Sequence, residues 1–434
     1  MNKRRKKQIA KGDFFGSFPC QQRNEQKTSY SWQYFPIVKC ALQQANTYEY
    51  HAVISNRSLV SIRLFYAAYF AAMGLILPYF PVYLTGLGMT TVWVGMFVGA
   101  LAATKVVAPP LAGLLLEYRN ANARTFLLIT AGLSALTSAL LIPQLEIGWM
   151  LAIVIAFGIF WAAILPLTDG LSLVVSEISV ISYGRLRVWG SIGFVLASFL
   201  GGLWLVGDNI GLFPWILTTL LILSTLAAMG FPDLAGLGKD SSKHQRYQPN
   251  PKALLWLLLI GFCMQASHGA YYGFFSLYML DAGYSGVEVG LFWILGVLAE
   301  IVLMWYWSKR IQAASPVFMF AVCLSLAAMR WFGLSITTNI FAVVLLQLLH
   351  AASFAAFHLS AVAWVRRFAK PHHQTSAQGW YSSIGFGLGS TLGIMLCGLI
   401  VQAQGYQTAF LACTWIAILG LLAVVGLRQA RSIT

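Results

Sequence analysis

Twelve long apolar stretches restrict what this chain can fold into more than any other feature. Each is about as long as the ~20 residues that an α-helix needs to cross the hydrocarbon core of a bilayer. Only 9% of the 434 residues are charged and 59% are hydrophobic, whereas an ordinary soluble domain has about 25% charged residues. The chain is therefore predicted to be an all-α membrane protein. The expected transmembrane helices cover residues 62–85, 92–115, 125–142, 148–172, 187–206, 211–231, 252–280, 288–307, 316–334, 340–364, 377–402 and 408–427.

The loops between these helices alternate between two compositions. One set contains no Lys or Arg, and the other set, together with both ends of the chain, holds nearly all of the basic residues. Because Lys and Arg collect on the cytoplasmic side, this alternation predicts twelve spans of the inner (plasma) membrane with both termini in the cytoplasm. It also explains the net charge of +15 without any binding of nucleic acid. The loops without Lys or Arg are 86–91, 143–147, 207–210, 281–287, 335–339 and 403–407.

A stretch of the first half of the chain recurs in the second half. Gly88-Met-Thr-Thr-Val-Trp-Val-Gly-Met-Phe97 returns as Gly283-Tyr-Ser-Gly-Val-Glu-Val-Gly-Leu-Phe292, and the same offset relates Lys105 to Glu300. A repeat built of membrane helices is typical of transporters in which two similar halves enclose a central site. We therefore expect two pseudo-symmetric bundles of six helices, with a basic and an acidic residue at matched depth.

The longest interior connection divides the chain into these two bundles. It carries Pro, Gly, Ser and several charges, and it places the N-terminal bundle at residues 61–231, a cytoplasmic linker at 232–251 and the C-terminal bundle at 252–434. Residues 1–60 form a basic extension without an apolar stretch of signal-peptide length. We interpret this extension either as a disordered cytoplasmic tail or as an artefact of the gene model, with translation beginning further along the chain.

Ionisable side chains inside the apolar helices are the candidates for function. Each costs about 2.5–3.5 kcal/mol at the centre of a membrane helix, so it is expected to face a partner or a watery cavity. Asp169 and Arg187 lie on consecutive antiparallel helices at similar depth, where a carboxylate and a guanidinium can pair. The alternative for this pair is a helix-end cap and a boundary residue of the positive-inside type. The full set is Lys105, Asp169, Arg187, His268, Glu300, Arg330, His350 and His358.

Glu300 is expected near the middle of the membrane, about 18 Å along its helix from the outer loop. A carboxyl group there suits reversible proton uptake, and the alternative is a structural ion pair with Arg330 or Lys105. His268 and His350 also lie midway along their helices, where imidazole can relay protons or hydrogen-bond a substrate. For each histidine, a simple link between two helices is the alternative.

Aromatic side chains near these groups could hold a flat ring, although packing or lipid contact is the commoner role for any single one. They are Tyr66, Tyr69, Trp161, Tyr271 and Tyr272. No ATP-binding loop, zinc-protease motif or serine-hydrolase motif is present in the sequence. Six scattered cysteines offer neither a disulfide framework nor a metal site. The chain is therefore expected to work without a cofactor and not as an enzyme.

Several strings fix polar residues among apolar ones and are specific enough for comparison. They are Gln265-Ala-Ser-His-Gly-Ala-Tyr-Tyr-Gly-Phe-Phe-Ser-Leu-Tyr278, Pro166-Leu-Thr-Asp169, Tyr183-Gly-Arg-Leu-Arg-Val-Trp-Gly-Ser191 and Gly296-Val-Leu-Ala-Glu300. Together with the two six-helix halves, they resemble the bacterial 3-phenylpropionic acid transporter family of the major facilitator superfamily. The resemblance runs from about residue 62 to the last helix and implies the major facilitator fold.

Two further features bear on this resemblance. The spacing of Asp169 and Arg187 is similar to that of the acid and the arginine that contact sugar in lactose-permease-like proton symporters, which implies that both face the central cavity. The superfamily's loop between helices 2 and 3 normally reads Gly-x-x-x-Asp-Arg/Lys-x-Gly-Arg-Arg/Lys. Here it is the degraded string Gly113-Leu-Leu-Leu-Glu117-Tyr-Arg119-Asn120, so the resemblance does not extend to the gating contacts of that loop.

The resulting hypothesis is a proton-driven, alternating-access importer of a small organic acid such as 3-phenylpropionate. The substrate carboxylate would pair with Lys105 or Arg187, and protonation of Glu300, Asp169 or a histidine would offset the charge. Small molecules, protons and lipid are the expected partners, and the protein is expected to work as a monomer. A sugar or nucleoside symporter of the same fold is the first alternative, a non-transporting membrane sensor is the second, and the direction of flux stays open.

Overall fold

The computed structural model describes residues 55–119, 122–143, 145–179, 181–233, 251–368 and 374–431. All regular elements in these residues are helices. Eleven spans among them are long and apolar enough to cross a membrane, and a shorter apolar helix occupies the position predicted for the third span. The predicted all-helical membrane fold is confirmed, and the described helices are consistent with twelve crossings. Most of the predicted extension 1–60 and of the linker 232–251 lies outside the described residues.

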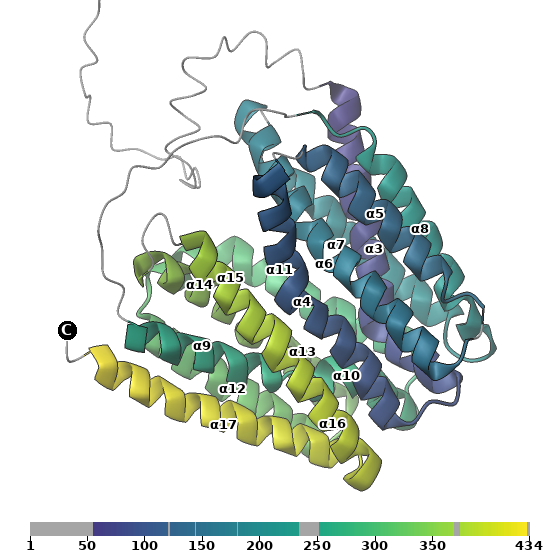
Figure 1. Cartoon of the computed structure of the whole chain (residues 1–434). Helices are drawn as coiled ribbons and strands as arrows, with labels where there is room; N and C mark the ends of the chain where they lie inside the picture. Colours follow the sequence, from purple (N-terminus) through teal and green to yellow (C-terminus); the bar gives the residue numbers. More distant parts are fainter. Residues whose placement is uncertain are drawn as a thin grey trace, which may run out of the picture. The chain divides into compact units, whose positions relative to one another are not determined.

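The first half of the chain forms six helices in the order expected (Figure 1). The first begins at Asn56, before the predicted start at residue 62, because the Ser55 hydroxyl caps it by accepting a hydrogen bond from the Ser58 backbone N–H at 3.1 Å. A 3₁₀ turn, η1, precedes the sixth helix. The elements are α3 (Asn56–Gly86), α4 (Thr91–Arg119), α5 (Ala123–Ala139), α6 (Ile147–Ile178), α7 (Tyr183–Trp204), η1 (Asp208–Leu212) and α8 (Phe213–Ala228).

The second half forms six more spans, three of which are interrupted. One span breaks at Ser267 and His268, and two others contain π-helical segments, η2 and η4. Segments of π-helix occur often at functional sites. The elements are α9 (Pro251–Ala266) with α10 (Gly269–Asp281), α11 (Gly286–Ala313), α12 (Pro316–Ile336), α13 (Ile340–Leu348) with η2 (Ala351–Ala356) and α14 (Phe357–Phe368), α15 (Gln374–Ser382) with η4 (Ser383–Gly389) and α16 (Ser390–Gln404), and α17 (Tyr406–Arg431).

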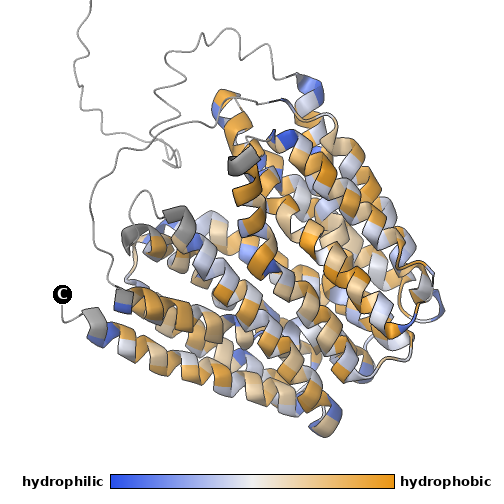
Figure 2. Cartoon of the chain, viewed as in Figure 1, coloured by the Kyte–Doolittle hydropathy of each residue, from blue (hydrophilic) through white to orange (hydrophobic). Residues whose placement is uncertain are grey.

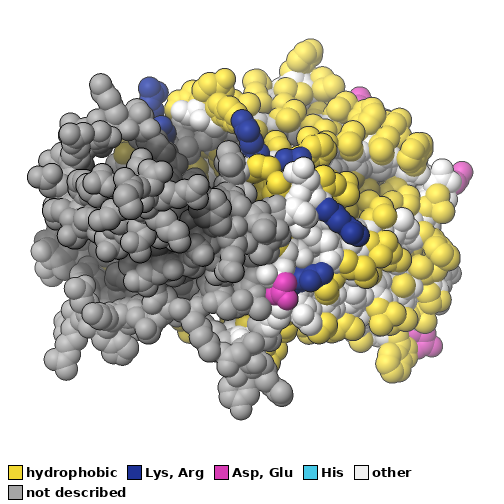
Figure 3. Space-filling model, turned by 90° about the horizontal axis from the view of Figure 1, so that it is seen from above, with side chains coloured by type: hydrophobic (Ala, Val, Ile, Leu, Met, Phe, Trp, Pro, Cys, Tyr) yellow, Lys and Arg dark blue, Asp and Glu magenta, His cyan; other side chains and the backbone are white. Residues whose placement is uncertain are grey.

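Apolar side chains cover the outside of the helices as well as their contacts. Figure 2 shows hydrophobic residues along the full length of most helices, and large apolar side chains such as Phe341 and Leu345 are exposed. In a soluble protein such a surface would be an interaction or aggregation site, but lipid covers it in a membrane protein. Lys and Arg side chains lie among apolar ones on the face shown in Figure 3.

The internal repeat is visible in the backbone. Gly88 follows α3 and Gly283 follows α10, and both adopt positive φ angles, 80° and 91°. A left-handed residue directly after a helix reverses the chain, and glycine adopts it without a Cβ clash. The two copies of the repeat therefore make the same turn before α4 and α11.

Glycine contacts bring the two halves together near the ends that carry the loops without Lys or Arg, here called the outer ends. Across α4 and α16, a Cβ on Gly95 would lie 3.1 Å from the Cα of Gly398. Across α7 and α11, a Cβ on Gly202 would overlap the backbone of Gly286. Helices approach this closely only through small residues. The contacts close the outer side of the space between the halves.

Candidate substrate cavity

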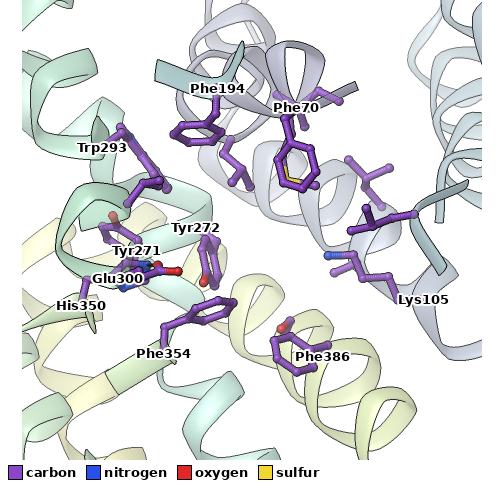
Figure 4. Close-up of a pocket in the computed structure, with 18 of the residues that line it drawn as sticks. Phe70, Lys105, Phe194, Tyr271, Tyr272, Trp293, Glu300, His350, Phe354 and Phe386 are labelled. Atoms are coloured by element: carbon purple, nitrogen blue, oxygen red, sulfur yellow. Dashed lines mark ion pairs between the residues drawn. The ribbon is translucent and has the colours of Figure 1, made fainter. Parts of the chain in front are cut away.

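A cavity of about 420 Å³ lies between the two halves of the chain (Figure 4). Its size falls within the range of ~300–1,000 Å³ that is typical of small-molecule sites. Helices α3, α4, α6 and α7 form one wall, and α9, α10, α11, η2, η4 and α16 contribute to the other. Most of the lining is apolar or aromatic. The aromatic residues are Phe70, Phe80, Trp161, Phe194, Tyr271, Tyr272, Trp293, Phe354 and Phe386.

Lys105 reaches into this cavity from α4, and Figure 4 shows its amine directed toward the centre. The side chain is exposed, and it makes no hydrogen bond or ion pair with any residue that the structure describes. Its neighbour Val106 packs against Gly387, and the Val106 carbonyl accepts a hydrogen bond from Ser383 at 3.2 Å. Lys105 thus lies beside η4 of the opposite half. An ammonium group in apolar surroundings is unfavourable without a counter-charge.

Glu300 lies on the opposite side of the cavity, at one end of a chain of buried polar groups. Its Oε1 is 2.9 Å from Nε2 of His350. The Nδ1 of His350 is 2.8 Å from Nη1 of Arg330, and Nη2 of Arg330 donates to Oε1 of Gln347 at 2.5 Å. Since arginine nitrogens only donate, Nδ1 of His350 must accept. The ring proton is therefore on Nε2, where it is donated to Glu300.

Arg330 is fully buried and is held by two aromatic rings as well as by these hydrogen bonds. Its guanidinium carbon lies 4.2 Å from the ring centroid of Tyr271 and 4.5 Å from that of Trp331. Such cation–π contacts stabilise a desolvated cation. A direct ion pair between Arg330 and Glu300, which was one alternative from the sequence, is not formed, because His350 lies between the two groups.

Asp169 and Arg187 lie together on the other wall, with Arg187 Nε 3.8 Å from Asp169 Oδ1. The same oxygen accepts a hydrogen bond from the Tyr66 hydroxyl at 2.7 Å. Arg187 lines the cavity and lies 5.3 Å from the ring centroid of Phe70, whereas Asp169, whose side chain is 27% exposed, is not among the lining residues. The expectation that both groups face the cavity is therefore met by Arg187 alone.

His268 lies at the break between α9 and α10, away from the cavity surface. It is completely buried, and its Nδ1 is 2.7 Å from the carbonyl oxygen of Met264. Its ring centroid is 4.9 Å from that of Trp331 and 6.1 Å from that of His350. It therefore packs behind the polar chain that holds Glu300.

The sequence candidates separate into those that line the cavity and those that do not. The first group is Lys105, Trp161, Arg187, Tyr271, Tyr272, Glu300 and His350. The second group is Tyr66, Tyr69, Asp169, His268 and Arg330, each of which contacts a residue of the first group or packs next to one that does. His358 is also absent from the lining, and its ring centroid is 5.6 Å from that of the lining residue Phe386. Tyr69, for example, stacks on Trp161 with ring centroids 4.1 Å apart.

Sequence reasoning did not single out several residues of the wall. Gln265 and Ser390 are uncharged polar residues in apolar helices, and a search limited to ionisable groups passes over them. Phe354 and Phe386 lie in the π-helical segments η2 and η4, which no sequence pattern predicted. The side chains of the degraded loop at 117–120 lie outside the described residues.

Comparison with known proteins agrees with this architecture. The chain is 28% identical over 357 residues to the "Probable 3-phenylpropionic acid transporter" of Escherichia coli (strain K12), covering 80% of this chain and 92% of the relative. It is 24% identical over 368 residues to the "Maltose permease" of Geobacillus stearothermophilus, covering 83% and 92%. Among solved structures, the nucleoside transporter NupG matches 86% of this chain and 100% of its own, with a TM-score of 0.73 and 16% identity.

The sequence also matches a described family over most of its length. The "MFS_1 like family" covers residues 59–412, which run from near the start of α3 to the first residues of α17 and include all the lining residues of the cavity named above. These matches identify the protein as a membrane transporter and not an enzyme, and the chain belongs to the MFS_1-like family of the major facilitator superfamily.

Proposed function

We propose that the protein is a proton symporter that imports a small aryl carboxylate, such as 3-phenylpropionate, by alternating access. The observation that carries this proposal is Lys105, a cation without a partner among the described residues in a cavity walled by aromatic side chains. A carboxylate would neutralise the amine, and the aromatic wall suits a flat ring.

The balance of charges around the cavity supports a substrate with one negative charge. Arg187 lies next to Asp169, and Arg330 is linked through His350 to Glu300, so these cations have negative partners. One carboxylate would supply the counter-charge that Lys105 does not find among the described residues. A neutral sugar or nucleoside would leave this amine unpaired in an apolar site, which is costly. The relatives named for maltose and nucleosides keep the neutral substrate as the alternative that the test below addresses.

Glu300 is the proposed carrier of the proton. It keeps 14% of its side chain exposed and lines the cavity. His350 has both ring nitrogens engaged, and a second ring proton on Nδ1 would meet a donor of Arg330. Asp169 is not among the lining residues and already has Tyr66 and Arg187 as partners. Glu300 is thus the carboxylate that can exchange a proton with the cavity without breaking the buried chain.

The membrane placement completes the proposal. Loops without Lys or Arg alternate with basic ones, which supports an inner-membrane protein with both termini in the cytoplasm. Because the glycine contacts close the outer side, the state described here would open toward the cytoplasm. Rocking of the two bundles about the cavity would expose it to the other side. Each half contributes part of the site, and a single chain suffices to form it.

Uptake of labelled 3-phenylpropionate by cells that lack their own transporter tests this function. Expression of the protein should raise uptake, and a protonophore should abolish the increase. Lys105→Gln should lower uptake at least tenfold at low substrate concentration, because a hydrogen bond to a charged group contributes about 1.5–3 kcal/mol. Lys309→Gln, at an exposed position near the end of α11, is the matched control and should keep wild-type uptake.

The uptake experiment can contradict the proton coupling, the substrate class or the direction of transport separately. Uptake that survives the protonophore would remove the proton coupling. Competition by nucleosides or glycosides but not by aryl acids would replace the substrate class with the neutral alternative. Lower accumulation than in the control cells would indicate export.

A further inference from the structure

The Glu300 carboxylate has an acceptor that no described residue uses. His350 is its hydrogen-bonding partner among the described residues, and that bond occupies Oε1. An ionised carboxylate has about four acceptor positions on two oxygens. The exposed part of the side chain lies at the cavity wall, so the unused acceptors are available to a ligand there.

The unused acceptors of Glu300 lie across the cavity from Lys105, which has no ion-pair partner in the described part of the chain. Figure 4 shows Glu300 and His350 on one side and Lys105 on the other, with aromatic side chains such as Tyr272 between them. Ser390 and Gln265, whose neighbours Gly389 and Gly385 belong to the η4 segment beside Lys105, also line the cavity. Lys105 thus lies across an aromatic chamber from Glu300 and His350, and Arg187 and Ser191 are the other polar residues of the described lining. A ligand that satisfies both Lys105 and Glu300 has a carboxylate at one end and a hydrogen-bonding group at the other.

The chemistry of Glu300 decides which hydrogen-bonding group the ligand should present to it. A proton carrier alternates between an ionised carboxylate, which only accepts hydrogen bonds, and a protonated carboxyl, which also donates one. A hydroxyl can donate to the first form and accept from the second. An ether only accepts, so it would lose its partner when the carboxyl is ionised. An ammonium group would find an acceptor in both forms, but it would lose its charged partner when the carboxylate takes up the proton.

From this geometry we propose that the substrate is an aryl acid with a hydroxyl group on its ring. Its carboxylate binds Lys105, its ring lies between the aromatic walls, and its hydroxyl bonds Glu300. This inference rests on the proposed function, which it narrows from aryl carboxylates in general to hydroxylated ones. An unsubstituted ring would cover Glu300 with a C–H edge and leave the desolvated carboxylate without a second hydrogen-bonding partner. Sites that hydrogen-bond a substrate hydroxyl discriminate strongly against analogues that lack the hydroxyl.

Isothermal titration calorimetry on the full-length transporter in lipid nanodiscs tests the inference. The ligands are 3-phenylpropionate, its 3- and 4-hydroxyphenyl analogues, and the 4-methylphenyl analogue, whose methyl group matches the hydroxyl in size. The better hydroxylated acid should bind at least tenfold more tightly than both the unsubstituted and the methylated acid, as expected for a hydrogen bond to a charged acceptor.

Two variants locate the effect. Glu300→Gln keeps an acceptor for His350 but removes the charge, so the unsubstituted acid no longer desolvates a carboxylate and the preference for the hydroxyl should shrink to threefold or less. The control is Glu288→Gln. Glu288 lies in the same helix, where its carboxylate accepts a hydrogen bond from the Ser285 backbone N–H at the exposed outer end, so this variant should keep the full preference for the hydroxylated acid.

The outcomes separate this inference from the proposed function. Equal affinities for hydroxylated and unsubstituted acids, or a preference that persists in Glu300→Gln, would overturn the hydroxyl site and leave the aryl carboxylate proposal intact. Failure of all four acids to bind a folded transporter would overturn both.

Discussion

His350 shows how much a single side chain can decide in this cavity. It stands between Arg330 and Glu300, which come from two other helices. Because Arg330 can only donate, the imidazole is held as the neutral Nε2–H form and passes a hydrogen bond on to the carboxylate. Removal of Arg330 would leave His350 and Gln347 without their buried partner, which is why we regard Arg330 as a positioning residue.

Exchange of the Glu300 carboxyl for an amide tests the proton coupling at this scale. Glu300→Gln should abolish accumulation of 3-phenylpropionate driven by an imposed proton gradient, because the amide cannot take up or release the proton. Exchange of external labelled for internal unlabelled 3-phenylpropionate should continue, since exchange requires no proton release. Proteoliposome uptake from pH 5.5 to 8 should fall with rising pH in the wild-type protein and stay flat in the variant, as follows from loss of the titrating group.

Glu288→Gln serves as the control for this experiment because it removes a carboxylate from the exposed capping box of the same helix. A variant at Glu300 that still accumulates substrate against its gradient would show that another group carries the proton.

Helices α7 and α11 pack closely on each other and keep the outer side closed. Gly202 and Gly286 meet backbone to backbone, and Gly290 packs in the same way on the carbonyl of Ser198. The equivalent contact in the other pair of helices joins α4 to α16, where the Thr91 hydroxyl also donates to Oε1 of Gln402 at 3.1 Å. The halves therefore meet through two related small-residue interfaces.

Gly202→Ala should open the outer side. The new methyl group would overlap the Gly286 backbone, and overpacking of this kind costs about 1–3 kcal/mol, or roughly 5- to 150-fold in the equilibrium between closed and open states. A membrane-impermeant maleimide applied from outside should therefore label Val98→Cys, a cavity position, faster in this variant. Gly148→Ala is the control, because no atom lies within 4 Å of a Cβ there. Equal labelling rates in both would argue against the interface as the outer gate.

The whole molecule joins two related halves around one asymmetric site. The same turn at Gly88 and Gly283 leads into α4 and α11, the two helices that carry Lys105 and Glu300. A pseudo-symmetric frame thus presents a cation from one half and a carboxylate from the other. The described helices of both halves and the lining residues of the cavity named above all lie at or beyond residue 55.

Removal of residues 1–54 should therefore leave transport intact. The truncated chain keeps Ser55, which caps α3, so the first helix should still begin at Asn56. Uptake of 3-phenylpropionate per molecule in the membrane, measured by immunoblot-normalised transport, should stay within about twofold of the full chain, as is usual for changes away from packed features. Loss of activity with normal membrane levels would favour the sensor hypothesis, in which the basic extension contacts a partner.

Hydropathy and loop charge were enough to predict the spans and the two halves, because a backbone in hydrocarbon must satisfy its hydrogen bonds within helices of nearly fixed length. Ionisable residues in those helices pointed to Lys105, Arg187, Glu300 and His350 for the same reason, since a charge in a membrane requires a partner or a cavity. The pairing of these groups depended on the three-dimensional packing. Glu300, Arg330 and His350 come from three helices, and contacts between residues far apart in the chain set the rotation of each helix about its axis. That rotation placed an imidazole between the charges and left Lys105 without an ion pair among the residues that the structure describes.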